Sequence, residues 1–393
     1  MTIKQLAVFI SIFLSAQDLS AMISTTKKRR TSGAAAFQEE MDNERRREIE
    51  RQAQLAGARI RTFCRNRSAA HIAVFMAEGA DINGQDEDTG KTALHFAAEN
   101  GDFTLVKRLI KLGADIHCLD NTRYTPLHYA AGSGDSDVIA LLLREGADIH
   151  KLTIRGVRAL HIAAERGHLE ICKLLVNAGS SPDSTTESYR TPLHIAAQQG
   201  HTLIVAFLLE KGASMGRVTL GRYTALHEAA FAGQSETAKF LIERGINKEA
   251  VAEDGLTALL LGIQREHEGI VTQLLDCGCN ANARTPEGDY ALHLAVIHGS
   301  KTICTALLKH EAKTDARDAE GFTPLQRAVQ TGHNECALAL AQGGADPLLK
   351  TPQGETSITL AYGTNNFSLA VELFNVKKSS DLTTRQSAQT SHV

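Results

Sequence analysis

A four-residue phrase built around Thr-Pro-Leu-His recurs along this chain at intervals of 33 residues. Its variants begin at positions 92, 125, 158, 191, 224, 257, 290, 323 and 356. The first and last of these positions lie 264 residues apart, which is eight intervals of 33. A constant period of this length indicates one structural unit copied along the chain. The copies must stack, because one unit alone cannot bury its apolar face.

Each unit has the sequence pattern of two short helices followed by a turn. A Thr such as Thr92 can cap a helix N-terminus with its hydroxyl, and Pro suits the first helical turn. Leu94, Ala97 and Ala98 then make a narrow apolar face, whose small alanines let a neighbouring helix approach closely. Gly residues nine and twenty-one positions after most unit starts predict the ends of the two helices. The polar residues that follow predict a hairpin-like loop.

With these units, the chain resembles the ankyrin repeat family. The resemblance covers about residues 58–375 and rests on the TPLH-type phrases, on Gly-His pairs such as Gly167-His168 and Gly200-His201, and on Gly-Ala-Asp-Ile at 113–116 and 146–149. It implies an all-α fold, an α-solenoid of about nine to ten stacked helix pairs with hairpin-like loops and a concave groove. It also implies structural rather than catalytic roles for the repeated histidines: His95, His128, His161, His168, His194, His201, His227, His267, His293 and His333.

The ends of the array depart from the pattern, and so does one unit inside it. Residues 58–91 lack the phrase, and we predict that they form a degenerate first unit that caps the stack. Residues 376–393 are rich in Ser, Thr and Gln, and we expect a loose, disordered tail. The unit that begins at Thr257 has Leu260 in place of His and Glu266 in place of Gly. We expect this unit to pack less well and to act as a hinge.

The first 21 residues have the layout of a secretory signal peptide. Lys4 precedes an apolar stretch at 6–16 that is too short to span a membrane, and small residues follow it. On this interpretation residues 1–21 are removed and the protein is exported. Met22 is an alternative start, which would give a cytoplasmic protein. Charges of alternating sign at helical spacing then predict a charged linker with an exposed helix over 22–57.

Composition excludes two classes of protein. The chain has 42 Lys and Arg against 45 Asp and Glu, so it lacks the strongly basic character of a surface built for nucleic acid. No apolar run reaches the ~18–20 residues that a membrane-spanning helix needs. We therefore predict neither nucleic-acid binding nor a membrane span.

The sequence offers no catalytic, cofactor or metal pattern. Residues 84–92 resemble a phosphate-binding loop that ends in Lys91, but five residues separate its glycines instead of four, and three of these are acidic. His227 and Glu228 begin like a zinc-protease helix, yet Phe231 stands where the second His is required. A nucleophile-elbow motif is also missing. We predict a protein that is not an enzyme and needs no cofactor.

The seven cysteines fall into two groups. Four take core positions of their units and are predicted to be buried packing residues: Cys64, Cys172, Cys304 and Cys336. The other three fall in loops: Cys118, Cys277 and Cys279. The Cys277-Gly-Cys279 pair flanks a helix end and leaves a redox or metal role open.

The variable positions of such an array are the hairpin tips and the exposed end of the first helix. In the first half of the array, these positions hold many Arg and aromatic residues, the types that anchor protein interfaces. We predict a partner-binding site formed by Arg123, Tyr124, Arg155, Arg166, Tyr189, Arg190, Arg222, Tyr223 and Phe231. Toward the C-terminus the tips become acidic, with Glu253, Asp254, Glu287, Asp289 and Glu320. The hypothesis is a basic and aromatic surface for an acidic protein segment.

These observations predict a non-catalytic scaffold for protein–protein interaction, exported and monomeric. The alternative is an intracellular adaptor that docks to a larger assembly through the charged N-terminal helix and the array. Removal of residues 1–21 distinguishes the two.

Overall fold

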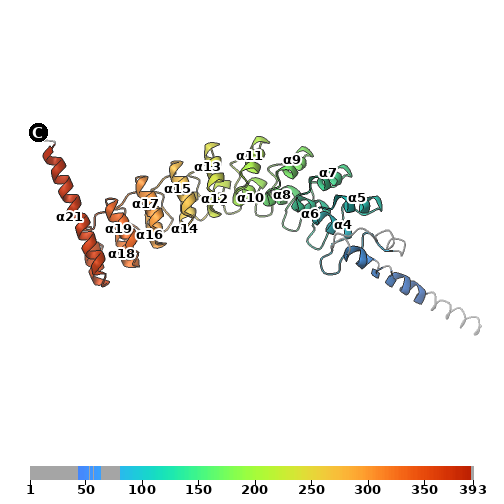
Figure 1. Ribbon diagram of the computed structural model, residues 1–393, viewed down its shortest axis with the longest axis horizontal. Helices are drawn as coiled ribbons and strands as arrows, with labels where there is room; N and C mark the ends of the chain where they lie inside the picture. The colour runs from blue at the N-terminus through green and yellow to red at the C-terminus, as the bar shows by residue number, and fades with distance from the viewer. Residues whose placement is uncertain (1–42, 53, 56, 63–79, 391–393) are drawn as a thin grey trace, which may run out of the picture.

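The computed structural model describes residues 43–52, 54, 55, 57–62 and 80–390, the side chains of 380–390 excepted. Over residues 80–390 the helices form pairs that stack side by side in one curved, elongated array (Figure 1). The first helices of the pairs are α4 (Ala93–Glu99), α6 (Pro126–Ser133), α8 (Ala159–Arg166), α10 (Pro192–Gln199), α12 (Ala225–Phe231), α14 (Ala258–Gln264), α16 (Ala291–Ile297), α18 (Pro324–Thr331) and α20 (Ser357–Gly363). The second helices are α5 (Phe103–Lys111), α7 (Ser136–Arg144), α9 (Leu169–Asn177), α11 (Thr202–Glu210), α13 (Ser235–Glu243), α15 (Glu268–Asp276), α17 (Lys301–Lys309), α19 (Asn334–Gln342) and α21 (Phe367–Thr390).

Local sequence signals set the helix bounds. Thr125 caps α6 with its hydroxyl, which accepts a hydrogen bond from the His128 amide, and Pro126 occupies the first turn. Gly134 ends the same helix in the left-handed conformation, with φ at +89°. The other first helices start at positions that differ by multiples of 33, although Arg158 and Tyr290 take the place of the capping Thr in α8 and α16. The predicted all-α solenoid is therefore confirmed in the described residues.

The core runs along the whole array as one continuous cluster. Ala97 and Ala98 of α4, and Leu105 and Leu109 of α5, are fully buried, and equivalent residues of each following pair extend the cluster. The small alanines let neighbouring first helices approach closely, while the leucines of the second helices fill the space behind them. Each pair is thus stabilised mainly by its two neighbours, as expected for a solenoid.

Buried histidines tie each unit to the next. In α6, the Thr125 amide donates to His128 Nδ1 at 3.1 Å. The proton of this neutral ring therefore sits on Nε2, which donates to the Val157 carbonyl of the next unit at 3.2 Å. The same two bonds recur at His95, His161, His194, His227 and His293.

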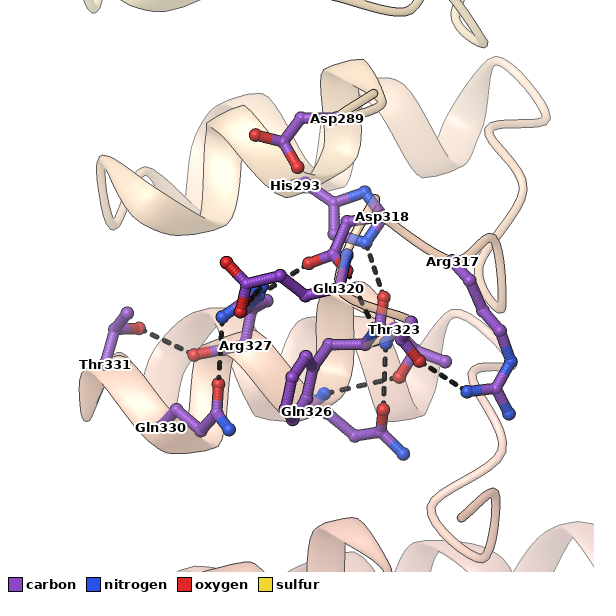
Figure 2. A network of polar contacts seen from close by, with 12 residues as sticks. Asp289, His293, Arg317, Asp318, Glu320, Thr323, Gln326, Arg327, Gln330 and Thr331 are labelled. Carbon is purple, nitrogen blue, oxygen red and sulfur yellow. Dashed lines mark hydrogen bonds and ion pairs between the residues drawn. The ribbon is translucent and has the colours of Figure 1, made fainter. Parts of the chain in front are cut away.

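Gln326 takes the place of this histidine in the unit that begins at 323. Its Oε1 accepts from the Thr323 amide at 2.9 Å, and its Nε2 donates to the Leu349 carbonyl at 2.8 Å. Figure 2 shows Gln326 beside Thr323, below His293 of the preceding unit. The slot therefore requires an acceptor and a donor at the right spacing, and it does not require a titratable ring.

The junction after the unit that begins at Thr257 lacks two hydrogen bonds that join neighbouring units earlier in the array. Leu260 has no polar group to reach the next unit. Earlier in the array, a backbone amide of each hairpin tip donates a hydrogen bond to a carbonyl of the preceding tip. The donors are the amides of Asn121, Ile154, Glu187, Leu220 and Glu253. The next equivalent residue is Pro286, which has no amide hydrogen. Exposed side-chain contacts such as Ser300 Oγ to Glu268, at 2.8 Å, cross the junction instead. The hinge remains a prediction, now with a physical basis at this junction.

The C-terminal end differs from the sequence-based expectation. A loose tail was expected from residue 376, but α21 continues as a helix to Thr390. The sequence holds no Gly or Pro after Gly363, so the signal that ends the other second helices is missing here. No helix in the described part of the chain is both long and apolar enough to cross a membrane.

At the N-terminal end, residues 43–52 of the charged stretch are helical and exposed. The predicted signal peptide at 1–21, the Met22 start and Cys64 lie outside the described residues. So do residues 63–79 within the predicted capping unit at 58–91.

Candidate protein-binding surface

The nine predicted contact residues lie on the hairpin tips and at the ends of the first helices. Six of them are exposed: Arg123, Arg155, Arg166, Tyr189, Arg222 and Phe231. The other three are half-buried: Tyr124, Arg190 and Tyr223. The structure brings five of them together in two hollows. It leaves four outside the linings of both: Arg123, Arg166, Tyr189 and Arg222.

Three of the tip residues adopt a backbone conformation that favours glycine. Arg123, Tyr189 and Arg222 have φ angles of +63°, +59° and +61°. They stand two residues before the start of their units, where six other units have Gly with positive φ: Gly90, Gly156, Gly255, Gly288, Gly321 and Gly354. A side chain in this region costs on the order of 1 kcal/mol or more relative to Gly. These three tips therefore carry side chains at a position where glycine would be less strained.

The first hollow lies between the tips of the units that begin at 125 and 158. Tyr124 and Tyr129 form its aromatic side, with ring centroids 5.4 Å apart. Ile154, which is 55% exposed, and Arg155 line the other side of a cavity of about 370 Å³. The Tyr129 hydroxyl donates to Asp120 Oδ2 at 2.6 Å, which fixes the ring in place. The cavity is large enough for one large apolar side chain.

Charges of both signs surround this first hollow. Burial raises the pKa of Tyr124, and the carboxylates of Glu165 and Asp120 raise it further against the opposing effect of Arg155 and Arg166. The Asp120 carboxylate is already occupied by Tyr129 and by the Thr122 and Tyr124 amides. Arg155 at the rim therefore remains available to a ligand.

The second hollow lies between the units that begin at 224 and 257. Tyr223, Phe231, Leu261 and Arg265 are among the residues that line a cavity of about 330 Å³. The Arg265 guanidinium lies 4.0 Å from the centre of the Phe231 ring, which holds the cation over an aromatic face. The Tyr223 hydroxyl donates to Asp254, and this bond is the first cause of its raised pKa, about 12.

Arg190 is neutralised inside this second hollow. Its Nε lies 3.2 Å from Glu228 Oε1, and its Nη2 donates to Gln198 at 2.7 Å. Burial raises the pKa of Glu228, and Arg190 opposes the shift. Arg190 therefore supports the wall of the hollow rather than offering a free cation to a partner.

The remaining arginines of the surface are free of ion pairs within the described residues. Four of them belong to the predicted site and one does not: Arg123, Arg155, Arg166, Arg222 and Arg265. In the C-terminal half the acidic tips are partly engaged. Arg327 pairs with Asp318 at 2.6 Å and with Glu320 at 2.9 Å, and Figure 2 shows the three side chains together.

Comparison with known proteins identifies the units. A family model that describes three consecutive ankyrin repeats matches the chain four times. The matches cover residues 62–153, 160–252, 218–285 and 259–351, which together exceed half of the chain. The chain belongs to the ankyrin repeat family. A stretch of 55 residues is also 42% identical to the Neurogenic locus Notch protein of Drosophila melanogaster, and it covers 14% of this chain and 2% of that protein. Ankyrin repeats are in general protein–protein interaction modules and typically non-catalytic.

Sequence reasoning missed several residues of the ankyrin surface. Tyr129, Glu228 and Leu261 occupy the position four residues after the unit start, which turns toward the hollows. This position follows the repeated histidine directly, so its period in the sequence was available as a signal. Ile154 and Arg265 were missed because their contacts depend on how neighbouring units stack.

The loop at 84–92 of the ankyrin array has no phosphate-binding geometry. The Gly90 amide is occupied by the Asp86 carbonyl, and Asp86 Oδ1 accepts from Thr89. Lys91 Nζ pairs with Glu99 at 2.8 Å and lies over the Tyr129 ring. Among the described residues, no group of three or more His, Cys, Asp or Glu could hold a metal ion.

The cysteines of the array are mostly buried, as predicted for Cys172, Cys304 and Cys336. Interaction with the Cys336 thiol of the next unit raises the pKa of Cys304, a contact that the sequence analysis did not find. The loop residue Cys279 is also buried, which raises the pKa of its thiol to about 12 and lowers its reactivity. The redox hypothesis for Cys277 and Cys279 remains untested. The raised pKa of Cys279 makes its reactive thiolate form rarer.

Proposed function

We propose that this ankyrin protein is a non-catalytic, monomeric scaffold that binds an acidic protein segment along the tips and first helices of its first half. The rigid stack presents a preorganised surface, so little conformational entropy is lost on binding. Backbone hydrogen bonds also join the tips of this half to one another. The amides of Asn121, Ile154, Glu187, Leu220 and Glu253 each donate to a carbonyl of the preceding tip.

The observation that carries the proposal is the backbone strain at Arg123, Tyr189 and Arg222. Folding alone would favour glycine at this position, as in six other units. Strained residues of this kind concentrate at functional sites, where the side chain contributes something other than stability. Two of the three are arginines that form no ion pair within the described residues, which favours a partner of negative charge.

Replacing these three residues by glycine should separate stability from binding. We expect the Arg123→Gly, Tyr189→Gly, Arg222→Gly triple variant to gain about 0.5–1 kcal/mol of unfolding free energy at each site, because the strain is removed. We expect it to bind a Glu-rich synthetic peptide of about 16 residues at least tenfold more weakly than the unchanged chain. Urea denaturation and fluorescence anisotropy measure the two effects.

The matched control is Glu311→Gly. Glu311 has a φ of +62° at the end of a second helix, away from both hollows, so its replacement should raise stability without changing peptide affinity. Matched Lys-rich and uncharged peptides set the background. Equal binding of all three peptides, or unchanged Glu-rich peptide binding by the triple variant, would contradict the proposal.

We also propose that the protein is exported, on the basis of the signal-peptide layout of residues 1–21. The intact mass of the protein from its native cell fractions should then lack the first 16 or 21 residues. Retention of these residues, or a start at Met22, would contradict export and would favour the intracellular adaptor.

A further inference from the structure

The two hollows share one chemistry and one equivalent tyrosine, although their arginines occupy different positions in the repeat. Each combines an aromatic side chain, an apolar side chain and an arginine: Tyr124, Ile154 and Arg155 in the first, and Phe231, Leu261 and Arg265 in the second. Tyr124 and Tyr223 occupy the same place in their units and lie 99 residues apart, which is three repeats of 33.

Each hollow fits one large apolar side chain beside a carboxylate. The cavities measure about 370 and 330 Å³, and their aromatic and aliphatic walls provide apolar contact. Arg155 and Arg265 are exposed and have no ion pair within the described residues. The other charges of the second hollow are already matched, because Arg190 pairs with Glu228 and Tyr223 donates to Asp254.

The distance between the hollows follows from the stacking of the units. Neighbouring packed helices lie about 8–10 Å apart, so three repeats separate the hollows by about 24–30 Å. An extended chain advances about 3.3 Å per residue, so about seven to nine residues of it span this distance.

We infer that the partner is one extended segment with two anchors, each a large apolar residue next to an acidic residue, about eight residues apart. This inference rests on the proposed function and adds the spacing and composition of the segment. Between the anchors the segment passes the tip that carries Tyr189, in the intervening unit, and the tip that carries Arg222, which belongs to the first unit of the second hollow.

A series of synthetic peptides tests the spacing. Each peptide carries two Phe-Glu pairs joined by an unstructured spacer, varied from about 2 to about 14 residues. Affinity measured by fluorescence anisotropy should peak near a separation of eight residues, at least about tenfold above that of a peptide with a single Phe-Glu pair. Shorter spacers cannot reach both hollows, and longer ones dilute the second contact.

Two surface variants assign the hollows. Ile154→Glu and Arg265→Glu each change an exposed side chain, so the fold should persist. Each variant should reduce two-anchor binding to the single-anchor level and abolish the dependence on spacing. Leu203→Glu is the control, since Leu203 is 73% exposed on the second helix α11 and lines neither hollow.

Three outcomes separate this inference from the proposed function. A peak near eight residues that both variants remove supports two anchors. Binding of Glu-rich and single-anchor peptides without any dependence on spacing overturns the two-anchor inference and leaves the proposed function in place. Failure of every acidic peptide to bind overturns both.

Discussion

Lowering the pH from 7.5 to about 4.5 is expected to unfold the ankyrin array. Burial lowers the pKa of His128, His161 and His194 to about 4, while the same rings in the unfolded chain titrate near 6.5. These folded-state pKa values are depressed, so the stability of the neutral rings is complete above about pH 6.5. It is lost progressively as the pH falls toward 4, because the unfolded chain binds protons first.

The expected effect is large. A difference of about 2.5 pKa units corresponds to about 3 kcal/mol for each ring, so three rings together reach on the order of 10 kcal/mol. This is comparable to the whole unfolding free energy of a typical domain. Burial also lowers the pKa of His95, His227 and His293. Circular dichroism at 222 nm against pH, and urea denaturation at pH 7.5 and 5.5, measure the loss.

The chain itself offers the control for this prediction. Gln326 makes both hydrogen bonds of the histidine slot without a titratable group. A His128→Gln, His161→Gln, His194→Gln triple variant should therefore stay folded at pH 7.5 and unfold at a midpoint about one pH unit lower. The same acid midpoint in both proteins would contradict the role given to the histidines.

Gly167→Ala should destabilise the array by about 2–4 kcal/mol. Gly167 has a φ of +79°, and a Cβ built there would lie 2.7 Å from His201 Cε1 of the next unit. The His201 ring cannot move freely, because its Nε2 bonds the Glu165 carbonyl at 3.1 Å. Left-handed strain of about 1 kcal/mol is therefore added to overpacking of about 1–3 kcal/mol. The midpoint of urea denaturation measures the sum.

Gly332→Ala separates the two terms. Gly332 has a similar φ of +76°, but nothing lies within 4 Å of its Cβ position. Only the left-handed strain should therefore act, and the unfolding free energy should fall by about 1 kcal/mol. Equal destabilisation at both sites would show that the histidine contact is unimportant. In addition, His201→Ser should relieve part of the cost of Gly167→Ala in a double-mutant cycle.

The same contact explains an irregularity of the sequence. Glu266 stands where other units have Gly, and it adopts a φ of +57°. In the next unit Ser300 stands where four other units place the histidine that covers this position, so no ring overpacks a side chain at 266. The Glu266 carboxylate instead contacts His298 Nδ1 at 3.3 Å. The exception at 266 was visible in the sequence, but its partner at 300 became clear only when the two units were stacked.

The candidate surface was predicted in outline and changed in detail. Tip positions are fixed by the repeat period, so all nine predicted residues lie on tips or helix ends. Their pairing is not periodic. Arg190 is not a free cation, because Glu228, 38 residues later, forms an ion pair with it. Arg265, which was not predicted, joins the surface because its guanidinium lies over the Phe231 ring.

The sequence alone determined the repeating unit, its two helices and their caps, and the family resemblance implied a structural role for its repeated histidines. These features rest on local interactions, namely a capping hydroxyl, a left-handed glycine and an apolar period, which recur in most units. Only the tertiary structure decided which side chains of neighbouring units meet, such as Cys304 with Cys336, and where the tips enclose a hollow. Those contacts depend on the offset and angle at which units stack, and many residues set that geometry together.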